Sequence, residues 1–486
     1  MVIETNNIYG KIVDRLTPQQ LQIISDACSF IVQGAEFMKF SKYSRYKHFD
    51  GHKKLFNKQT RRFPIGLLAR VTAICNNWEK VDIIDKRIHL DDVYQYQYDD
   101  SILRDYQREA LIASLVNGNG ILKVATGGGK TIIAGCTIGA LQKKSIFIVH
   151  TRDLLYQAKE SFQRLFPIET IGQIGDGIID YQNITVATMQ TLAILGNVEV
   201  GKNSDEDESK DEAKIQADKI KKQAFAEYAK TVQCVMMDEV QIVCSQTAQG
   251  VRFLFPASDY AFGYSASPWR DDGSDLAIEA AFGQRIIDIN ATKLIDLGYL
   301  VRPTILVHKT SYPVYNQGNY AELYKRYIVE NGERNSQVAD DALWAYRQGM
   351  NTLILVTQIK HGEYLEQLIR LEGGVNCDFI SGKSGMKKRK QAIQDMRDGK
   401  ISLLIASTIA DVGLDIPRLQ CIVEAGAGKS SVTALQRLGR IMRPFEGKDS
   451  CIFISYRDRC KYIDSHIDKK LEIWRTEDGF IINEED

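Results

Sequence analysis

The sequence predicts an α/β protein with two tandem doubly wound parallel-sheet domains, preceded by a small α/β domain at the N-terminus. Three observations indicate this architecture. From about residue 100, short apolar runs of strand length alternate with longer helical segments. The alternation restarts near Arg302, after a first series of strands that ends at Tyr264. The first 98 residues precede both series and differ from them in composition.

Length and composition agree with this division. A chain of 486 residues has room for about three domains of ordinary size. We therefore expect an N-terminal domain at 1–98, a first sheet domain at 99–300 and a second at 301–486. Hydrophobic residues make up 44% and charged residues 26%, which is typical of globular proteins with an ample core. Lys+Arg and Asp+Glu balance at 62 each, so any surface for a polyanion must be a local patch.

The sequence favours a cytoplasmic protein that does not associate with membranes. No apolar run approaches the length of a membrane span, and the first residues lack the character of a signal peptide. Nine Cys occur without a CxxC pair, and no His lies at ligand spacing from a Cys. We expect buried, reduced thiols and no metal site beyond the Mg²⁺ of a bound nucleotide.

A glycine loop after a buried strand predicts a nucleotide site. The apolar run 121–125 leads into Thr126, three glycines (Gly127, Gly128 and Gly129) and the pair Lys130-Thr131, which opens a helix. Strand, glycine loop and helix in this order form a P-loop, whose backbone N–H groups surround phosphates. Lys130 would reach the β- and γ-phosphates, and the Thr131 hydroxyl would bind Mg²⁺. One departure from the general pattern is Val124, where the first Gly is expected.

An acidic pair later in the chain supplies the partner that a P-loop needs. The apolar run 231–237 continues directly into Asp238 and Glu239. Asp238 would hold Mg²⁺ through water, and Glu239 would orient and deprotonate the attacking water. A glycine turn that opens a helix can be purely structural, but two carboxylates at a sheet edge would then carry a desolvation cost without purpose. The combination predicts an NTPase.

Polar residues follow several of the predicted strands. Thr151 and Arg152 come after the strand 145–150, and Thr188 ends the strand 183–188. The carboxyl ends of strands form the ligand face of a doubly wound sheet, so these groups suit a phosphodiester backbone. Thr188 and Thr191 are equally good helix N-caps. Gln107 lies about two dozen residues before Lys130, and its amide fits the N6/N7 edge of adenine.

Residues 201–230 contain eight acids and seven bases at helical spacing. We interpret them as a solvated helical insertion without chemistry. The second domain is predicted to contain strands at 352–357, 377–381, 402–407, 419–425 and 451–456. The run 425–430 resembles another P-loop, but it lacks an acidic strand downstream, so a glycine turn is the better interpretation. Beyond it, Arg440 and Arg443 lie three residues apart, which predicts one shared helix face from which they could reach a γ-phosphate.

The N-terminal domain is rich in cations and aromatic residues. Residues 39–70 contain ten Lys and Arg against one acid, with six aromatic residues interleaved. Cations for phosphates and rings for bases are the ingredients of a nucleic-acid surface. We expect Lys53, Lys54, Arg61 and Arg62 to contact nucleic acid, with Phe49 to Gly51 forming a hairpin turn. The alternative is a small domain whose aromatic residues form a core and whose cations are solvated.

With these pieces in order, roughly residues 100–460 resemble the superfamily 2 helicases. The resemblance implies two RecA-like domains with ATP between them. It implies that Arg104 and Gln107 read adenine, that Gly127–Thr131 form motif I, and that Thr151-Arg152 and Thr188 fall in motifs Ia and Ib. Asp238–Gln241 would be motif II, Ser265 and Ser267 the motif III that couples hydrolysis to movement, and Thr357 part of motif IV. Thr408, Gly413 and Asp415 match motif V, with Thr408 on nucleic acid and the other two near ATP, and Gln436, Gly439, Arg440 and Arg443 match the catalytic motif VI.

The run 46–68 and the join 298–303 are similar to the phage recombination helicases of the UvsW family. That resemblance implies an ATP- and Mg²⁺-dependent DNA helicase that acts with 3′→5′ tracking on branched or partly single-stranded DNA. Forks, Holliday junctions and R-loops, which contain an RNA–DNA hybrid, would be its substrates in replication, recombination and repair. The alternatives are an RNA helicase, the motor of a restriction system, or a nucleic-acid annealing protein whose ATPase is vestigial.

Overall fold

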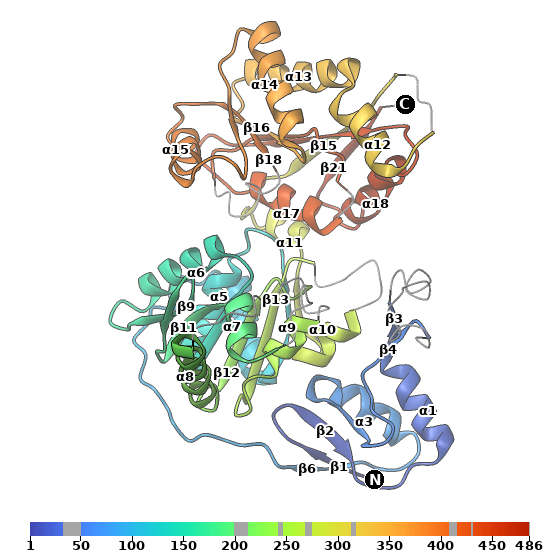
Figure 1. The fold of residues 1–486 in the computed structure, drawn as a ribbon, viewed down its shortest axis with the longest axis vertical. Helices are drawn as coiled ribbons and strands as arrows, with labels where there is room; N and C mark the ends of the chain where they lie inside the picture. Colours follow the sequence, from blue (N-terminus) through green and yellow to red (C-terminus); the bar gives the residue numbers. More distant parts are fainter. Residues whose placement is uncertain are drawn as a thin grey trace. The chain divides into compact units, whose positions relative to one another are not determined.

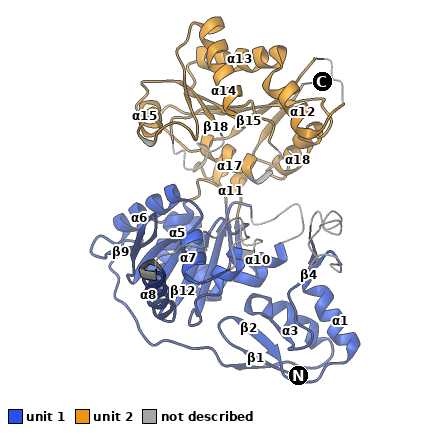
Figure 2. Cartoon of the chain, viewed as in Figure 1, with its two compact units in different colours: residues 1–124, 129–288 blue, residues 125–128, 289–486 orange. Residues whose placement is uncertain are grey.

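The computed structural model describes residues 1–32, 50–198, 212–241, 246–267, 275–312, 317–407, 416–428 and 431–485. The chain forms two compact units, one made of residues 1–124 and 129–288 and the other of residues 125–128 and 289–486 (Figure 2). Their secondary structure alternates between helices and strands along most of the chain (Figure 1). Every helix in the described ranges is too short or too polar to cross a lipid bilayer.

A small four-stranded sheet begins the first unit, with the strand order β5-β2-β1-β6. Its strands are β1 (Val2–Thr5), β2 (Tyr9–Ile12), β5 (Arg62–Pro64) and β6 (Asp82–Asp85). The helices α1 (Pro18–Ala27) and α3 (Leu68–Asn76) and the short η2 (Ile65–Leu67) accompany it. A separate pair, β3 (Ser29–Ile31) and β4 (His52–Lys54), is antiparallel. The N-terminal domain has a buried core of its own, which includes Ile3, Ile24 and Phe63.

An eight-stranded sheet forms the rest of the first unit, in the order β10-β9-β11-β8-β12-β13-β7-β14. Its strands are β7 (Asn119–Val124), β8 (Ser145–Val149), β9 (Ile171–Gly175), β10 (Ile178–Asp180), β11 (Ile184–Thr188), β12 (Cys234–Asp238), β13 (Tyr260–Ser265) and β14 (Arg285–Ile289). Its helices are α4 (Asp105–Asn117), α5 (Lys130–Leu141), α6 (Arg152–Leu165), α7 (Met189–Leu195), α8 (Glu212–Ala229), α9 (Gln246–Arg252) and α10 (Asp275–Phe282).

This sheet is buried on both faces, as a doubly wound sheet requires. Ile146 and Ile148 of β8 belong to an apolar core together with Phe255 and other residues on or near α7–α10. Phe147, between them in the strand, points to the other face because side chains alternate along a strand. There its ring meets the ring of Phe162 on α6, edge to face at 5.3 Å. Layers of helices therefore cover both sides, and the carboxyl ends of the parallel strands remain for ligands.

The second unit contains a seven-stranded sheet in the order β17-β18-β16-β19-β20-β15-β21, in which neighbouring strands pair in parallel. Its strands are β15 (Pro303–Lys309), β16 (Thr352–Val356), β17 (Asp378–Ile380), β18 (Leu403–Ser407), β19 (Cys421–Glu424), β20 (Cys451–Arg457) and β21 (Ile481–Glu484). Its helices are α11 (Ala291–Asp296), α12 (Tyr320–Tyr324), the π-helix η4 (Lys325–Val329), α13 (Gly332–Arg347), α14 (Ile359–Gly373), α15 (Met386–Arg397), α17 (Ser431–Ile441) and α18 (Asp464–Trp474).

These sheets confirm the predicted fold class, two tandem RecA-like domains. The domain boundaries at residues 98 and 300 stay predictions. The strand predicted at 231–237 begins only at Cys234 and includes Asp238. The sequence pattern did not predict five strands of the two large sheets, β9, β10, β14, β15 and β21. All eight cysteines within the described residues are free and buried, as expected.

The N-terminal domain is fixed to the first RecA-like domain. A Cβ atom on Gly66 would lie 2.1 Å from the carbonyl oxygen of Glu279 in α10, so only glycine fits this close approach. Arg70 donates hydrogen bonds to both carboxylate oxygens of Glu279, at 3.0 and 2.5 Å. At a second point, the Asn7 amide donates to Asp259. The two parts therefore form one packed body.

Two connecting segments pack more closely than their sequences suggest. Residues 93–101, between β6 and α4, form no helix or strand, but Tyr96 is buried, and its hydroxyl donates to the carbonyl of Lys143. The insertion 201–230 is described from residue 212, where it forms α8. Much of α8 is exposed, as predicted, yet Phe225 and Tyr228 lie in the apolar core of the eight-stranded sheet. The prediction of a solvated insertion was wrong for this last turn, because charge counting overlooked its two aromatic residues.

Candidate ATPase site and nucleic-acid contacts

The glycine loop has the backbone that its sequence predicts. It follows β7 and ends where α5 begins at Lys130. Gly127 and Gly129 have φ angles of 86° and 80°, in the left-handed region that favours glycine. Gly129 is also required for steric reasons, because a Cβ atom there would lie 2.4 Å from the side-chain nitrogen of Gln107.

Lys130 lies beside the predicted acidic pair. Its Nζ is 3.3 Å from Oε1 of Glu239, and about seven-eighths of each side chain is buried. Asp238 ends β12, and its carboxylate accepts a hydrogen bond from the backbone N–H of Glu239. Glu239 has a φ of 51°, which costs on the order of 1–3 kcal/mol for a residue with a side chain. The surrounding structure thus holds a strained backbone at the point where these groups meet.

The two carboxyl groups have opposite pKa shifts. Burial and the neighbouring charge of Glu239 raise the pKa of Asp238 to about 7. Burial acts in the same direction on Glu239, but the charge of Lys130 and hydrogen bonds from Gln241 and Lys130 outweigh it, and the pKa of Glu239 is lowered. Asp238 is therefore a buried carboxyl group whose ionised form lacks full compensation, which a divalent cation would supply.

Mg²⁺ fits this donor set. No cluster of three or more His, Cys, Asp or Glu side chains within the described residues could hold a metal ion. Mg²⁺ usually takes one or two carboxylates and completes its shell with water and nucleotide phosphates. Asp238 and the hydroxyl of Thr131, in the first turn of α5, are the protein groups that would hold it. The bound ion would neutralise phosphate charge, and Lys130 and Glu239 would position the phosphates and the attacking water.

A chain of hydrogen bonds leads from Glu239 to the predicted coupling serines. The side-chain nitrogen of Gln241 donates to Glu239 at 2.7 Å, and Ser265 donates its hydroxyl to the Gln241 side-chain oxygen at 2.6 Å. The backbone N–H of Ser267 in turn donates to the Ser265 hydroxyl. Because Ser265 is fully buried, water does not compete for its hydrogen bond with Gln241. This chain joins the residues predicted to form motifs II and III.

The structure brings Gln107 to the glycine loop. Gln107 is buried at the start of α4, and its side-chain oxygen accepts from the backbone N–H of Arg104 at 3.0 Å. Its amide nitrogen faces Gly129, as the close approach above shows. The role of this pair toward adenine stays a prediction.

Hydroxyl groups predicted to contact nucleic acid also have local partners. Thr151 is the N-cap of α6 and accepts from the N–H of Leu154, so its hydroxyl has a structural role. Arg152 pairs with Asp176 at 2.7 Å. Thr188 donates to Thr191, and it does not cap α7 with its side chain. These groups lie at the carboxyl ends of the neighbouring strands β8 and β11.

In the second unit, Thr357 follows β16, is exposed and shares a short hydrogen bond with the hydroxyl of Tyr324. Sequence reasoning missed Tyr324, since nothing in the pattern marks it. Thr408, Gly413 and Asp415 lie outside the described residues, as do Lys429 and Ser430 of the second glycine run. Gln436 and Arg440 lie on α17, which ends at Ile441. Arg443 is beyond that end, so the prediction of one shared helix face was wrong.

Arg437, between the predicted catalytic residues, belongs to a buried ion cluster. It contacts Glu424 at 2.6 Å, and Lys470 contacts the other carboxylate oxygen at 2.5 Å. At most 5% of any of these three side chains is exposed. Although burial opposes ionisation, the two cations lower the pKa of Glu424. Arg437 therefore holds α17 on β19, and a role at ATP would remove it from this cluster.

The four N-terminal cations have different surroundings. Lys54 is exposed and pairs with Asp50, and Arg62 is exposed with its guanidinium 4.4 Å above the ring of Tyr9. Lys53 donates to Gln249 of α9, and Arg61 to the carbonyl of Asp14. The predicted hairpin turn at 49–51 lies partly outside the described residues.

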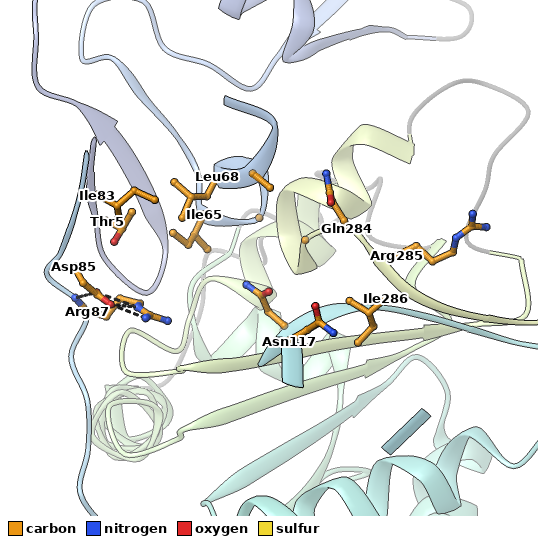
Figure 3. A pocket seen from close by; sticks show the side chains of 14 residues that line it. Thr5, Ile65, Leu68, Ile83, Asp85, Arg87, Asn117, Gln284, Arg285 and Ile286 are labelled. Carbon is orange, nitrogen blue, oxygen red and sulfur yellow. Dashed lines mark hydrogen bonds and ion pairs between the residues drawn. The ribbon is translucent and has the colours of Figure 1, made fainter. Parts of the chain in front are cut away.

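A cavity of about 590 Å³ lies away from these groups (Figure 3). It is lined by residues of the N-terminal domain, among them Ile65, Ile83 and Arg87, and by Asn119 at the amino end of β7. Arg87 is held by Asp85 on the cavity wall. Since the glycine loop follows the carboxyl end of β7, the cavity belongs to the opposite end of that strand and is distinct from the ATPase site.

Family comparisons agree with this geometry. Residues 100–249 match the model of the type III restriction enzyme res subunit, and residues 336–444 match the helicase conserved C-terminal domain. Together the two matches cover more than half of the chain and include Lys130, Asp238, Glu239, Arg440 and Arg443. The chain belongs to the superfamily 2 helicases.

Individual relatives of this helicase are distant. Putative helicase 22 of Sulfolobus islandicus filamentous virus is 26% identical over 385 residues, which are 73% of this chain and 64% of that protein. The putative DNA 3′-5′ helicase Rad25 of Haloarcula marismortui is 24% identical, with 70% of this chain and 50% of that protein covered. This helicase thus spans between half and two thirds of these relatives. The DNA 3′-5′ translocase XPB2 of Sulfurisphaera tokodaii is 24% identical over 70% of this chain and 78% of that protein.

The fold is shared with a solved restriction-enzyme structure, and a second structure aligns along the whole chain at a lower score. A fragment of a putative HsdR subunit of a type I restriction enzyme from Vibrio vulnificus aligns with a TM-score of 0.59 and 17% identity, covering 80% of this helicase and 69% of that chain. The crystal structure of T4 UvsW aligns along 100% of this helicase and 99% of that chain, with a TM-score of 0.43 and 18% identity.

Proposed function

We propose that this chain is an ATP-dependent DNA helicase or translocase that unwinds or remodels branched DNA such as forks, Holliday junctions and R-loops. ATP and Mg²⁺ would drive it. The observation that carries the proposal is the cluster of Lys130, Asp238 and Glu239 at the carboxyl edge of the eight-stranded sheet. A phosphate-binding lysine, a metal-binding carboxylate and a second carboxylate for water are the groups that hydrolysis of a nucleoside triphosphate needs.

The residues around this cluster support a motor more than a vestigial ATPase. The strained backbone of Glu239 and its hydrogen bonds through Gln241 to Ser265 hold the carboxylate beside Lys130, where hydrolysis would need it. In the proposed cycle, Glu239 moves when the γ-phosphate leaves, and the chain of hydrogen bonds transmits that movement to β13. Arg440 and Arg443 would stabilise the charge on the transferred phosphate.

The choice of branched DNA depends on the N-terminal domain. Its packing through Gly66 and Arg70 makes it move together with the first RecA-like domain. A surface that advances with the motor can hold or part the duplex ahead of it. Relatives named as DNA 3′-5′ helicases and translocases favour DNA and a 3′→5′ direction.

The proposal is tested by measuring ATP hydrolysis and unwinding on forks, four-way junctions, RNA–DNA hybrids and duplex RNA in parallel. We expect stimulation by DNA and the fastest unwinding on branched substrates. Lys130→Ala should abolish hydrolysis, because the cation that holds the phosphates is lost, while DNA binding without nucleotide survives. A protein whose ATPase responds only to RNA would be an RNA helicase, and one that anneals strands without hydrolysis would lack a working motor.

A further inference from the structure

His150 is a polar residue beside the ATPase site to which the function above gives no part. It directly follows β8, whose residues are all buried, and it directly precedes Thr151, the N-cap of α6. Its backbone is therefore fixed on both sides, by a buried strand and by a capped helix. A side chain at such a position is held more precisely than one on a free loop.

The strand register places His150 opposite Glu239. β8 pairs in parallel with β12, and Ile148 lies opposite Met237. Two residues further along, the same register brings His150 beside Glu239, and each is the first residue after its strand. Neighbouring strands lie about 4.8 Å apart, so the two side chains are within reach of one another.

The strand on the other side of β8 offers His150 a weaker partner. β11 pairs with β8, and Thr188 lies opposite Val149, so the next position belongs to Met189. A thioether is only a weak hydrogen-bond acceptor. Of the two side chains that the register places next to His150, the carboxylate of Glu239 is thus the strong acceptor.

The imidazole of His150 is neutral and has an unused nitrogen. Burial lowers the pKa of His150, and the charge of Glu239 opposes this shift without reversing it. A neutral imidazole has one donor nitrogen and one acceptor nitrogen. Within the described residues, the buried Nδ1 has no hydrogen-bond partner. Because a buried polar atom without a partner is unfavourable, Nδ1 should gain one in another state of the site.

Glu239 loses a partner when a nucleotide binds. In this structure Nζ of Lys130 is 3.3 Å from Oε1 of Glu239, and Gln241 donates to Oε2 at 2.7 Å. The lysine of a P-loop binds the β- and γ-phosphates, so Lys130 would turn from Oε1 to the nucleotide. Gln241 alone would then hold a carboxylate that has to keep one orientation toward the attacking water.

We propose that His150 is a positioning residue for Glu239: in the nucleotide-bound state its Nδ1–H donates a hydrogen bond to the Glu239 carboxylate and replaces Lys130. A carboxylate oxygen has two lone pairs, so Oε1 can accept from His150 and still bind the attacking water. His150 acts through Glu239 and does not need to contact the nucleotide. The inference rests on the proposed function, because it concerns the residue that orients water for hydrolysis.

The test compares His150→Ala, His150→Gln and His150→Asn. The amide nitrogen of Asn lies near the position of Nδ1, whereas that of Gln lies near Nε2, so Asn keeps the hydrogen bond and Gln does not. ATP hydrolysis is measured with and without single-stranded DNA, together with DNA affinity and the thermal midpoint. We expect Ala and Gln to lower kcat by about 10- to 100-fold, the scale of losing a partner that orients a reacting group. Asn should restore most of kcat, and KM for ATP and DNA affinity should stay unchanged in all three variants.

A second measurement follows the imidazole itself. In protein with isotope-labelled histidine, the NMR signal that His150→Asn lacks belongs to His150. Adding ADP with beryllium fluoride and Mg²⁺ should shift its Nδ1 resonance and protect the Nδ1 proton from exchange with water. In Glu239→Ala the same addition should leave this resonance unchanged.

Several results would overturn the proposal. Equal losses of kcat in the Asn and Gln variants, or an Nδ1 resonance that ignores the nucleotide, would show that the hydrogen bond does not form. A raised KM at unchanged kcat would make His150 a nucleotide contact, and weaker DNA binding at unchanged kcat would group it with Thr151. If the wild-type protein hydrolyses no ATP with any nucleic acid, the proposed function itself fails, and the NMR comparison still decides the role of His150.

Discussion

Arg70 of the N-terminal domain donates two hydrogen bonds to Glu279 of α10, at 3.0 and 2.5 Å, and only 13% of the Glu279 side chain is exposed. α10 is the first described helix after the end of β13, where Ser265 and Ser267 lie. The N-terminal domain is thus attached to the element that comes after the predicted coupling serines. A motor that moved β13 would have a direct route to this domain.

The first prediction concerns that attachment. Arg70→Ala leaves Glu279 largely buried without its partner, and Gly66→Val forces a side chain against the backbone of α10. We expect each variant to keep DNA-stimulated hydrolysis within about twofold and to lose most unwinding of forks, because ATP turnover would no longer move the N-terminal domain. The measurements are ATPase and strand-displacement rates on the same fork.

A matched control is Arg164→Ala, which removes the exposed pair of Arg164 with Glu160. Exposed pairs contribute about 0–1 kcal/mol, so this variant should unwind normally. Normal unwinding by a folded Gly66→Val protein would show that the attachment has no part in the mechanism.

The second prediction concerns Gln241, which links Glu239 to Ser265. Gln241→Ala should leave ATP binding intact and reduce the number of base pairs opened per ATP, because the catalytic glutamate and the coupling serine are no longer linked. Gln241→Glu introduces a carboxylate beside Glu239 and should also slow hydrolysis. Steady-state hydrolysis and unwinding, compared as a ratio, check both. An unchanged ratio in Gln241→Ala would assign the hydrogen bonds to structure alone.

Features of this molecule that depend on a short stretch of sequence could be predicted, whereas features that depend on distant contacts could not. The glycine loop, the acidic pair and the central strands were predictable, because each is a short run whose residue pattern indicates its own conformation and burial. β14 was not, since the run Arg285–Ile289 is partly exposed at a sheet edge and lacks a continuous apolar pattern. The attachment of Gly66 to Glu279 joins residues more than two hundred positions apart, and no local pattern encodes it.

The arginines of α17 show the same limit at the site. A spacing of three predicted a shared helix face for Arg440 and Arg443, but the helix ends at Ile441. Spacing tells which residues would face together if the helix continued, whereas the end of a helix depends on the contacts of the residues beyond it. Here Lys448 donates to the carbonyl groups of Arg443 and Pro417 and fixes the turn.

The third prediction separates catalytic from structural arginines. Arg443→Ala, and to a lesser degree Arg440→Ala, should leave ATP binding largely intact and slow turnover by about 10³-fold, the scale of a lost transition-state arginine. Arg437→Ala should instead destabilise the protein by about 3–5 kcal/mol, because it leaves Glu424 with one cation in a buried site. Nucleotide binding, single-turnover hydrolysis and urea unfolding distinguish the two outcomes. Near-normal turnover in a folded Arg440/Arg443 double variant would place the finger role elsewhere.

The last prediction concerns the four N-terminal cations. If Lys53, Lys54, Arg61 and Arg62 face DNA, changing all four to Ala should flatten the dependence of log affinity on log salt by about two to four, since each phosphate adds roughly 0.9. Junction binding should weaken most, and ATPase activity at saturating single strand should change little.

The surroundings of the four cations divide them into two pairs. Lys54 and Arg62 are exposed, whereas Lys53 donates to Gln249 and Arg61 donates to the carbonyl of Asp14. The Lys54/Arg62 double variant should therefore account for most of the lost slope without loss of stability, and the Lys53/Arg61 variant should lower the thermal midpoint. A quadruple variant that binds junctions with wild-type affinity and slope would leave this domain as a brace on α10, because solvated surface charges are largely screened at physiological salt.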